Sequence, residues 1–335
     1  MRTDASISTA NGSTEKINPQ GMKMKTFNYT SKKVLGGLFA AVLVLCFVDS
    51  AHGQIWVTNL STGTIGEYNL DGTTINASIV SGIYTATGIA VSGNNLYVAS
   101  QDNDTIGEYN ATTGAAINAS LLSVGGYPNG LALSGNDLFV EPQLSNTIGE
   151  YDATTGAAIN ASLVTGLDYQ WLFGLTIAGN NLYVASSASD TVGEYNATTG
   201  AVINASLISG LAFPSGIAIS GNDLFVTNNQ SVISEYDATT GAVINASFIT
   251  GLDLPTGLAI LGNDLFVANS LGKTIGEYDA TTGAAINTSL ISGLDYPYDI
   301  AVEAQAVPEP STWALMLGGA GLLAFWRMRA RRIVS

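Results

Sequence analysis

The sequence contains one cysteine, one histidine and few charged residues of either sign. Charged residues make up 11% of the 335-residue chain, and only 11 of them are Lys or Arg. Cys46 and His52 both precede residue 54. The chain beyond that point therefore has no disulfide, no cysteine nucleophile, no histidine base and no Cys/His metal site.

Basic residues are scarcest in the middle of the chain. Residues 54–310 contain Lys273 as their only base against 23 Asp and Glu, a formal charge of −22. Nucleic acid is excluded as a partner, because its binding requires Lys and Arg to neutralise phosphates. A solvated acidic surface and a surface that binds divalent cations are the two interpretations left open.

The N-terminal segment reads as an export signal. A 15-residue apolar run at 34–48 follows Lys32 and Lys33, and the small residues of Ala51-His52-Gly53 come shortly after it. This order predicts a signal peptide over 1–53 that is cleaved after Gly53, with polar residues 1–21 as a long leading region. Met22 and Met24 are alternative starts to Met1.

One sequence motif, T-I-G-E-Y-[ND]-A-T-T-G-A-x-I-N-A-S, occurs six times with small variations. Its glutamates are Glu67, Glu108, Glu150, Glu194, Glu235 and Glu277. A period of about 41–44 residues is typical of propeller blades and of helical solenoids. The apolar runs are short, rich in Val, Ile, Tyr and Phe, and cut by Gly-Asn and Thr-Gly turns. This pattern favours strands.

Each repeat supplies four strands, here named A to D in chain order. In one repeat these are expected at 257–260, 265–268, 274–278 and 284–289. Ile55–Asn59 matches strand B and Asp299–Val302 matches strand A, so the two ends of the array complete one blade. The sequence predicts an all-β, six-bladed propeller over 54–304, whose ring is closed by strands from both ends.

The C-terminal segment, 305–335, contains Pro308, Glu309 and Pro310, then Ser311-Thr312-Trp313, an apolar stretch and an arginine cluster. It resembles the PEP-CTERM sorting signal. That resemblance implies cleavage by an exosortase near the Pro-Glu-Pro triplet and delivery to the cell surface or extracellular matrix. A helix over 312–326 would span roughly 22 Å, less than the ~30 Å hydrocarbon core. So short a helix favours a transient anchor in the inner membrane over a permanent span.

The repeat unit P-x-G-[IL]-A-[IV]-x-G-N-D-L-[FY]-V-A-N is similar to the NHL repeat. The resemblance implies a six-bladed propeller of a group that includes lactonase-like and streptogramin-lyase-like enzymes. Such lyases would be expected to use a histidine, which the repeats lack. Lactonases use Glu, Asn and Asp, which are present.

The loops between strands D and A and between B and C differ from repeat to repeat, whereas the A–B and C–D turns hardly change. The variable loops are rich in aromatic residues, one of which is Tyr84. Our candidate ligand-binding residues are Asn129 and six of these aromatics: Tyr127, Tyr169, Trp171, Phe213, Tyr296 and Tyr298. Aromatics beside Asp168, Asp253 and Asp295 predict a carbohydrate or protein surface. Filling of gaps between blades is the alternative.

Two acids break the repeat. Glu141 ends a B strand, and Asp299 replaces the glycine that opens strand A. Asp299 is expected near the channel mouth, ringed by the residues that precede the glycine: Thr87, Asn129, Phe173, Ser215, Thr256 and Tyr298. Glu141, Asn129 and Asp299 together offer oxygen ligands suited to Ca²⁺. Degenerate repeat positions are the alternative reading.

Two functions follow. The first is a surface or matrix module that binds polysaccharide or protein and needs no catalysis and no cofactor. The second is a calcium-dependent, lactonase-like hydrolase or lyase with its site at the channel mouth.

Overall fold

The computed structural model describes residues 13–17, 23–27, 53–167, 172–228 and 230–304. The chain divides into two units, 1–51 and 52–335. In the first unit, β1 (Ser13–Ile17) pairs antiparallel with β2 (Lys23–Phe27). The apolar segments expected as export signal and C-terminal helix lie outside the described residues. Within the described ranges, no helix is long and apolar enough to cross a membrane.

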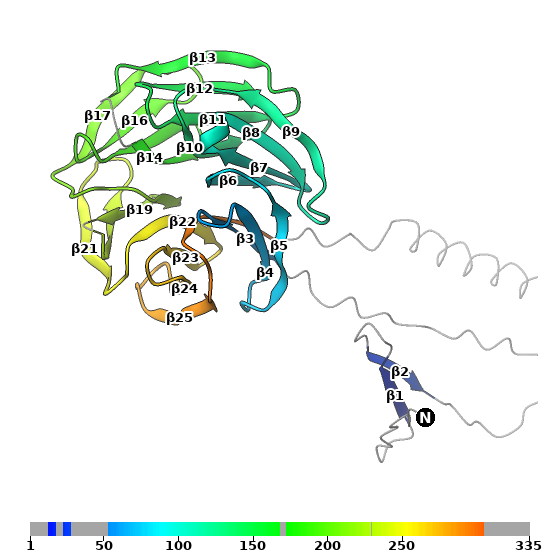
Figure 1. The fold of residues 1–335 in the computed structure, drawn as a ribbon. Coiled ribbons are helices and arrows are strands. Elements are labelled where there is room, and N and C mark those ends of the chain that lie inside the picture. The colour runs from blue at the N-terminus through cyan, green and yellow to red at the C-terminus, as the bar shows by residue number, and fades with distance from the viewer. Residues whose placement is uncertain (1–12, 18–22, 28–52, 168–171, 229, 305–335) are drawn as a thin grey trace, which may run out of the picture. The chain divides into compact units, whose positions relative to one another are not determined.

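The second unit contains six four-stranded antiparallel sheets arranged as the blades of a propeller (Figure 1). The six-bladed prediction is confirmed. The blades consist of β26 (Pro297–Glu303), β3 (Gln54–Asn59), β4 (Thr64–Asn69) and β5 (Thr74–Ser81) in blade 1; β6 (Ala86–Ser92), β7 (Asn95–Ser100), β8 (Thr105–Asn110) and β9 (Ala116–Ser123) in blade 2; β10 (Pro128–Ser134), β11 (Asp137–Pro142), β12 (Thr147–Asp152) and β13 (Ala158–Thr165) in blade 3; β14 (Leu172–Ala178), β15 (Asn181–Ser186), β16 (Thr191–Asn196) and β17 (Val202–Ser209) in blade 4; β18 (Ile217–Ser220), β19 (Asp223–Asn228), β20 (Val232–Asp237) and β21 (Val243–Thr250) in blade 5; and β22 (Pro255–Leu261), β23 (Asp264–Asn269), β24 (Thr274–Asp279) and β25 (Ala285–Ser292) in blade 6. A short 3-10 helix, Gln101–Asn103, follows β7.

The hydrophobic core is divided among the contacts between neighbouring blades. Six clusters of buried residues are present, each built from two adjacent sheets. Between blades 1 and 2, for example, Trp56 and Ile65 pack with Leu96 and Val98. A blade that packs on both faces needs apolar side chains on both faces of its inner strands. This explains the nearly continuous apolar runs of strands A and B.

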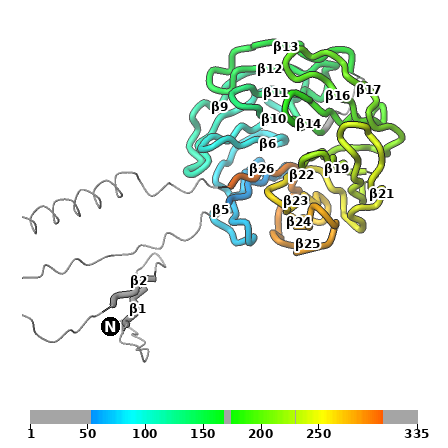
Figure 2. Tube along the Cα trace, turned by 180° about the vertical axis from the view of Figure 1, so that it is seen from behind, coloured from blue at the N-terminus to red at the C-terminus, as the bar shows by residue number. Residues whose placement is uncertain are grey.

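The ring closes in blade 1, as the sequence predicts. The last strand, β26, pairs antiparallel with β3, so that Ile300 lies opposite Val57 and Val302 opposite Ile55. Seen from behind, β26 lies between the inner strands of its neighbours, β22 and β6 (Figure 2). Strand β26 is longer than expected from the repeat and begins at Pro297, a position where a missing N–H does not interrupt a ladder.

The C–D turns are alike because one hydrogen-bond pattern builds them. In blade 6, Asp279 Oδ1 accepts the N–H groups of Thr281 and Thr282, and Asn263 Nδ2 donates to Asp279 Oδ2. Asp152 and Asp237 accept the equivalent bonds in blades 3 and 5. Short side chains that bond to their own backbone fix such turns. This face of the ring is therefore conserved between repeats for structural reasons.

Candidate functional site

A cavity of about 890 Å³ is enclosed by the inner strands of all six blades. Residues of the B–C and D–A loops, among them Gln101, Gln143, Phe213, Gln230 and Tyr296, line one end of it. This end belongs to the face on which the repeats differ. The volume falls in the range of small-molecule sites.

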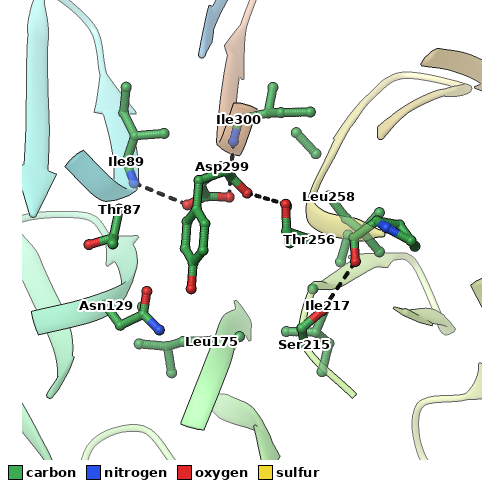
Figure 3. Close-up of a pocket in the computed structure, with 18 of the residues that line it drawn as sticks. Thr87, Ile89, Asn129, Leu175, Ser215, Ile217, Thr256, Leu258, Asp299 and Ile300 are labelled. Atoms are coloured by element: carbon green, nitrogen blue, oxygen red, sulfur yellow. Dashed lines mark hydrogen bonds between the residues drawn. The ribbon is translucent and has the colours of Figure 1, made fainter. Parts of the chain in front are cut away.

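The wall of the cavity has a polar layer near the variable loops and an aliphatic layer deeper in the channel. Figure 3 shows side chains from both layers around the cavity. Thr87, Asn129, Ser215, Thr256 and Tyr298 belong to the first layer. Two positions further along each inner strand the side chain is branched and apolar, in agreement with the period of a strand. This second layer consists of Ile89, Leu131, Leu175, Ile217, Leu258 and Ile300. The side chain of Phe173 lies outside the described residues.

Hydroxyl groups of the polar layer join neighbouring blades. Thr87 Oγ1 donates to the carbonyl of Pro128 at 2.9 Å, and Thr256 Oγ1 donates to the carbonyl of Tyr298 at 2.7 Å. These bonds cross from one inner strand to the next. The polar layer therefore holds the ring together as well as lining the cavity.

Asp299 occupies a position that is glycine in the other five repeats. At Gly88 a Cβ atom would lie 2.0 Å from the carbonyl oxygen of Asn129, and at Gly174 it would lie 2.0 Å from that of Ser215. The inner strands are thus too close there for any side chain. At Asp299 the carboxylate instead accepts N–H bonds from Ile89 of blade 2 (3.0 Å) and from Ile300 (2.9 Å). Asp299 thereby links the closing strand β26 to blade 2.

Opposing effects set the pKa of the Asp299 carboxyl. Burial raises its pKa to about 6, and the two backbone hydrogen bonds oppose that rise. The side chain is partly accessible only because it lines the cavity. It is the one carboxylate among the described residues of the cavity wall.

Glu141 is fully buried on β11 behind Gly130, rather than in the cavity wall. Its Oε2 accepts the N–H of Gly130 at 3.2 Å, and its Oε1 has no hydrogen-bond partner within the described part of the chain. Burial raises the pKa of Glu141 to about 8, against the effect of the Gly130 bond. The carboxyl is therefore mainly protonated at neutral pH.

Tyr298 brings the predicted residues together. Burial is the main cause of the strongly raised pKa of its phenol; a hydrogen bond with the Asn129 side chain opposes the rise, and the charges of Glu141 and Asp299 add to it. The phenol of blade 1 thus reaches Asn129 of blade 3. Glu141 and Asp299 are near enough for their charges to act on the same phenol. Among the described residues, no group of three or more His, Cys, Asp or Glu is placed to hold a metal ion. The calcium site stays a prediction.

Aromatic side chains of the variable loops point to solvent or to the cavity. Tyr84, Phe213 and Tyr127 are 66%, 63% and 42% exposed. Phe213 and Tyr296 line the cavity, whereas Tyr84 and Tyr127 lie outside its wall. These exposed rings therefore do not fill gaps between blades. Tyr169 and Trp171 lie outside the described residues.

The backbone fixes these aromatic residues in position. Tyr127, Phe213 and Tyr296 all have a left-handed conformation, with φ of 59°, 50° and 58°. The carbonyl of Tyr127 accepts the N–H of Gln143, and that of Tyr296 accepts the N–H of Leu60. Such a conformation is costly for a bulky residue and persists where surrounding bonds determine it. The rings at the rim are thus presented rigidly.

Amides at the rim were not among the residues that sequence reasoning selected. Gln101 Nε2 donates to Gln143 Oε1 at 2.8 Å, across the gap between blades 2 and 3. Gln230 occupies the equivalent loop of blade 5. The signal was a glutamine directly after strand B in two repeats, Gln101 and Gln143, and one position later in a third, Gln230. The other three repeats have Leu60, Ser187 and Ser270 directly after strand B.

Comparison with solved structures identifies the fold. The chain is similar to one in the crystal structure of a nidogen/laminin complex, with a TM-score of 0.61 and 13% identity over 76% of this chain and 99% of that chain. It is also similar to a protein of unknown function from Bacteroides caccae, with a TM-score of 0.59 and 17% identity over 75% and 98% of the two chains. A computationally designed protein, Ika8, gives 0.50 and 15% over 87% and 88%. At these identities the likeness concerns the fold alone.

No curated protein matches the chain. Residues 306–332 match the family model of the PEP-CTERM protein-sorting motif. This motif is a recognition signal for processing by an exosortase, and it begins just after the strand that closes the propeller. The chain is therefore an exported six-bladed propeller that carries a PEP-CTERM sorting signal, by which it is processed at its C-terminus and displayed at the cell surface or outside the cell.

Proposed function

We propose that the processed protein is a non-catalytic binding module that holds a neutral polysaccharide at the mouth of its central cavity. The observation that carries this proposal is the cavity itself, which opens on the one face where the six repeats differ. Rigid aromatic rings and amide side chains surround that opening. Apolar faces beside a few well-placed polar groups are the usual composition of a ligand site.

Charge favours a neutral ligand. Residues 54–310 carry a formal charge of −22, and their single base, Lys273, is engaged with Asp295 at 3.6 Å. A polyanionic polysaccharide would be repelled, because the described cavity wall offers it no cationic side chain. Hydroxyl-rich neutral chains match the Gln, Ser and Thr groups of the opening.

The route to the surface belongs to the same proposal. Residues 34–48 act as the apolar core of a signal peptide that is cut after Gly53, and the apolar segment after Trp313 holds the chain transiently at the inner membrane until the exosortase cleaves near Pro308–Pro310. The repeats are of the NHL type. Intact-mass measurement of the protein recovered from the cell surface tests both cleavage positions.

The proposal is tested with a matched pair of variants. Phe213 and Tyr84 are similarly exposed on the same face, but only Phe213 lines the cavity. Titration calorimetry with neutral oligosaccharides is expected to show binding that Phe213→Ala weakens at least about ten-fold and Tyr84→Ala leaves unchanged. Equal effects of the two substitutions, or tighter binding of uronic-acid oligosaccharides, would overturn the proposal.

A second candidate function is the calcium-dependent hydrolase or lyase. The observation in its favour is that Glu141, Asn129 and Asp299 all interact with Tyr298, together with the Glu141 oxygen that lacks a hydrogen-bond partner among the described residues. Terbium luminescence sensitised by tyrosine gives a direct test. A signal that Ca²⁺ displaces, and that Asp299→Ala removes, would support this function, whereas no signal would count against it.

A further inference from the structure

The cavity is deeper on one side of the ring than on the other. Beyond the first aliphatic layer, Ile177, Ile219 and Ile260 of blades 4, 5 and 6 still line it. The equivalent residues of blades 1, 2 and 3, which are Val302, Val91 and Leu133, lie outside its wall although all three are within the described residues. The six repeats therefore do not contribute equally to the lower part of the channel.

The shallower side carries the hydrogen bond between the side chains of Tyr298 of blade 1 and Asn129 of blade 3. The deeper side is a slot lined by Leu175, Ile177, Ile217, Ile219, Leu258 and Ile260, which we call the acyl slot. Figure 3 labels Leu175, Ile217 and Leu258 of this set. All six side chains are purely aliphatic, so the slot suits an uncharged apolar group and excludes a charged one.

The hydrogen-bond network fixes which bonds the Ser215 hydroxyl at the top of the slot donates and accepts. Thr227 Oγ1 accepts the N–H groups of Ser215 (3.0 Å) and Gly216 (2.8 Å), which occupy its lone pairs. Its own proton is then directed to Ser215 Oγ at 2.7 Å, and Ser215 donates in turn to the carbonyl of Pro255 at 3.3 Å. Ser215, which lines the cavity, is left with a free lone pair. It presents an acceptor to the ligand.

An acceptor directly above an aliphatic slot matches an N-acyl group, whose N–H donates while its alkyl part is buried. We infer that the site selects N-acylated amino sugars, with the acyl group in the acyl slot and its N–H bonded to Ser215. This rests on the proposed function, because it specifies which neutral polysaccharide the cavity mouth takes. A plain hexose offers a hydroxyl at that place and leaves the slot empty.

The test compares two neutral oligosaccharides on the exported, processed protein. Chitotetraose and cellotetraose share a β-1,4 backbone and differ only in the acetamido or hydroxyl group at C2. Burial of one methyl group changes a binding constant by roughly four-fold, so calorimetry is expected to show chitotetraose binding at least that much more tightly. Neither sugar is charged, so the acidic protein does not bias the comparison.

A pair of variants shows whether the slot causes the preference. Ile219→Thr places a hydroxyl in the slot, and Leu133→Thr makes the same kind of change at the equivalent position of blade 3, outside the cavity. The preference for chitotetraose is expected to disappear in the first variant, with cellotetraose affinity retained, and to persist in the second.

The outcomes separate the inference from the function beneath it. Equal affinities for the two sugars, or a preference that survives Ile219→Thr, would overturn the acyl slot and leave the polysaccharide module standing. Absence of binding by both sugars and by other neutral oligosaccharides would overturn the proposed function itself and the inference with it.

Discussion

Replacing Glu141 by glutamine removes a carboxyl group that the folded protein holds in its neutral form. Glu141 is fully buried, and burial raises its pKa from the ordinary 4.5 to about 8. Between these two values the folded chain retains a proton that the unfolded chain releases. Stability contributed by the neutral carboxyl is therefore complete below about pH 4.5 and is lost as the pH rises through about 8.

The magnitude follows from the shift. One pKa unit corresponds to 1.36 kcal/mol, so a rise from 4.5 to about 8 costs the native state up to about 5 kcal/mol between pH 4 and pH 9. Glutamine has nearly the same shape, can still accept the Gly130 N–H and carries no charge at any pH. The Glu141→Gln variant should match the parent in stability at pH 4–5 and exceed it progressively above pH 6.

Urea unfolding followed by tryptophan fluorescence at pH 5 and pH 8.5 measures this difference. Other carboxyls with raised pKa values, such as Asp299, are common to both proteins and cancel in the comparison. Unfolding free energies that differ by a constant amount at both pH values would refute the reasoning. They would mean that Glu141 titrates alike in the folded and unfolded chains.

Two further substitutions test how the inner strands are held together. Gly88→Ala would place a methyl group 2.0 Å from the Asn129 carbonyl oxygen, so we expect the free energy of unfolding in urea to fall by more than about 2 kcal/mol. The same change at Gly135, where no atom lies within 4 Å, tests the separate cost of a left-handed position. A negligible loss at Gly88 would contradict the close approach of blades 2 and 3. Thr227→Val removes the acceptor of the buried Gly216 N–H and the partly buried Ser215 N–H, and should cost about 1–3 kcal/mol. Amide hydrogen exchange should become faster at Ser215 and Gly216; unchanged exchange at both amides would count against the hydrogen-bond network above the acyl slot.

Much of the fold could be predicted because the sequence repeats the pattern of one blade six times. The period placed the strands, and the unmatched fragments at the two ends placed the closure, since Ile55–Asn59 and Asp299–Val302 each fit one strand of the missing unit. Strand ends were less accurate. Strand β22 extends to Pro255 and Leu261 because inner strands continue past the apolar core residues that marked them.

The candidate site was predicted less completely, for a physical reason. Deviations from the repeat marked Glu141 and Asp299, and the charges of both act on Tyr298, an aromatic residue of the variable loops. The depth of the cavity beside blades 4–6 could not be read in this way, because Ile219 and Leu133 are equally ordinary members of the repeat. They differ in the depth of the channel beside each blade, which depends on the assembled ring and is not recorded in any local pattern.

The closing pair of strands also determines how the molecule resists force. The first residue of β3, Gln54, lies opposite the last residue of β26, Glu303. A load that pulls the two chain ends apart therefore acts on one rung of the ladder at a time, in the manner of a zip, rather than shearing all rungs together. A protein tethered through the chain beyond residue 304 would yield first at blade 1. The same junction that makes the ring continuous is thus its point of mechanical release.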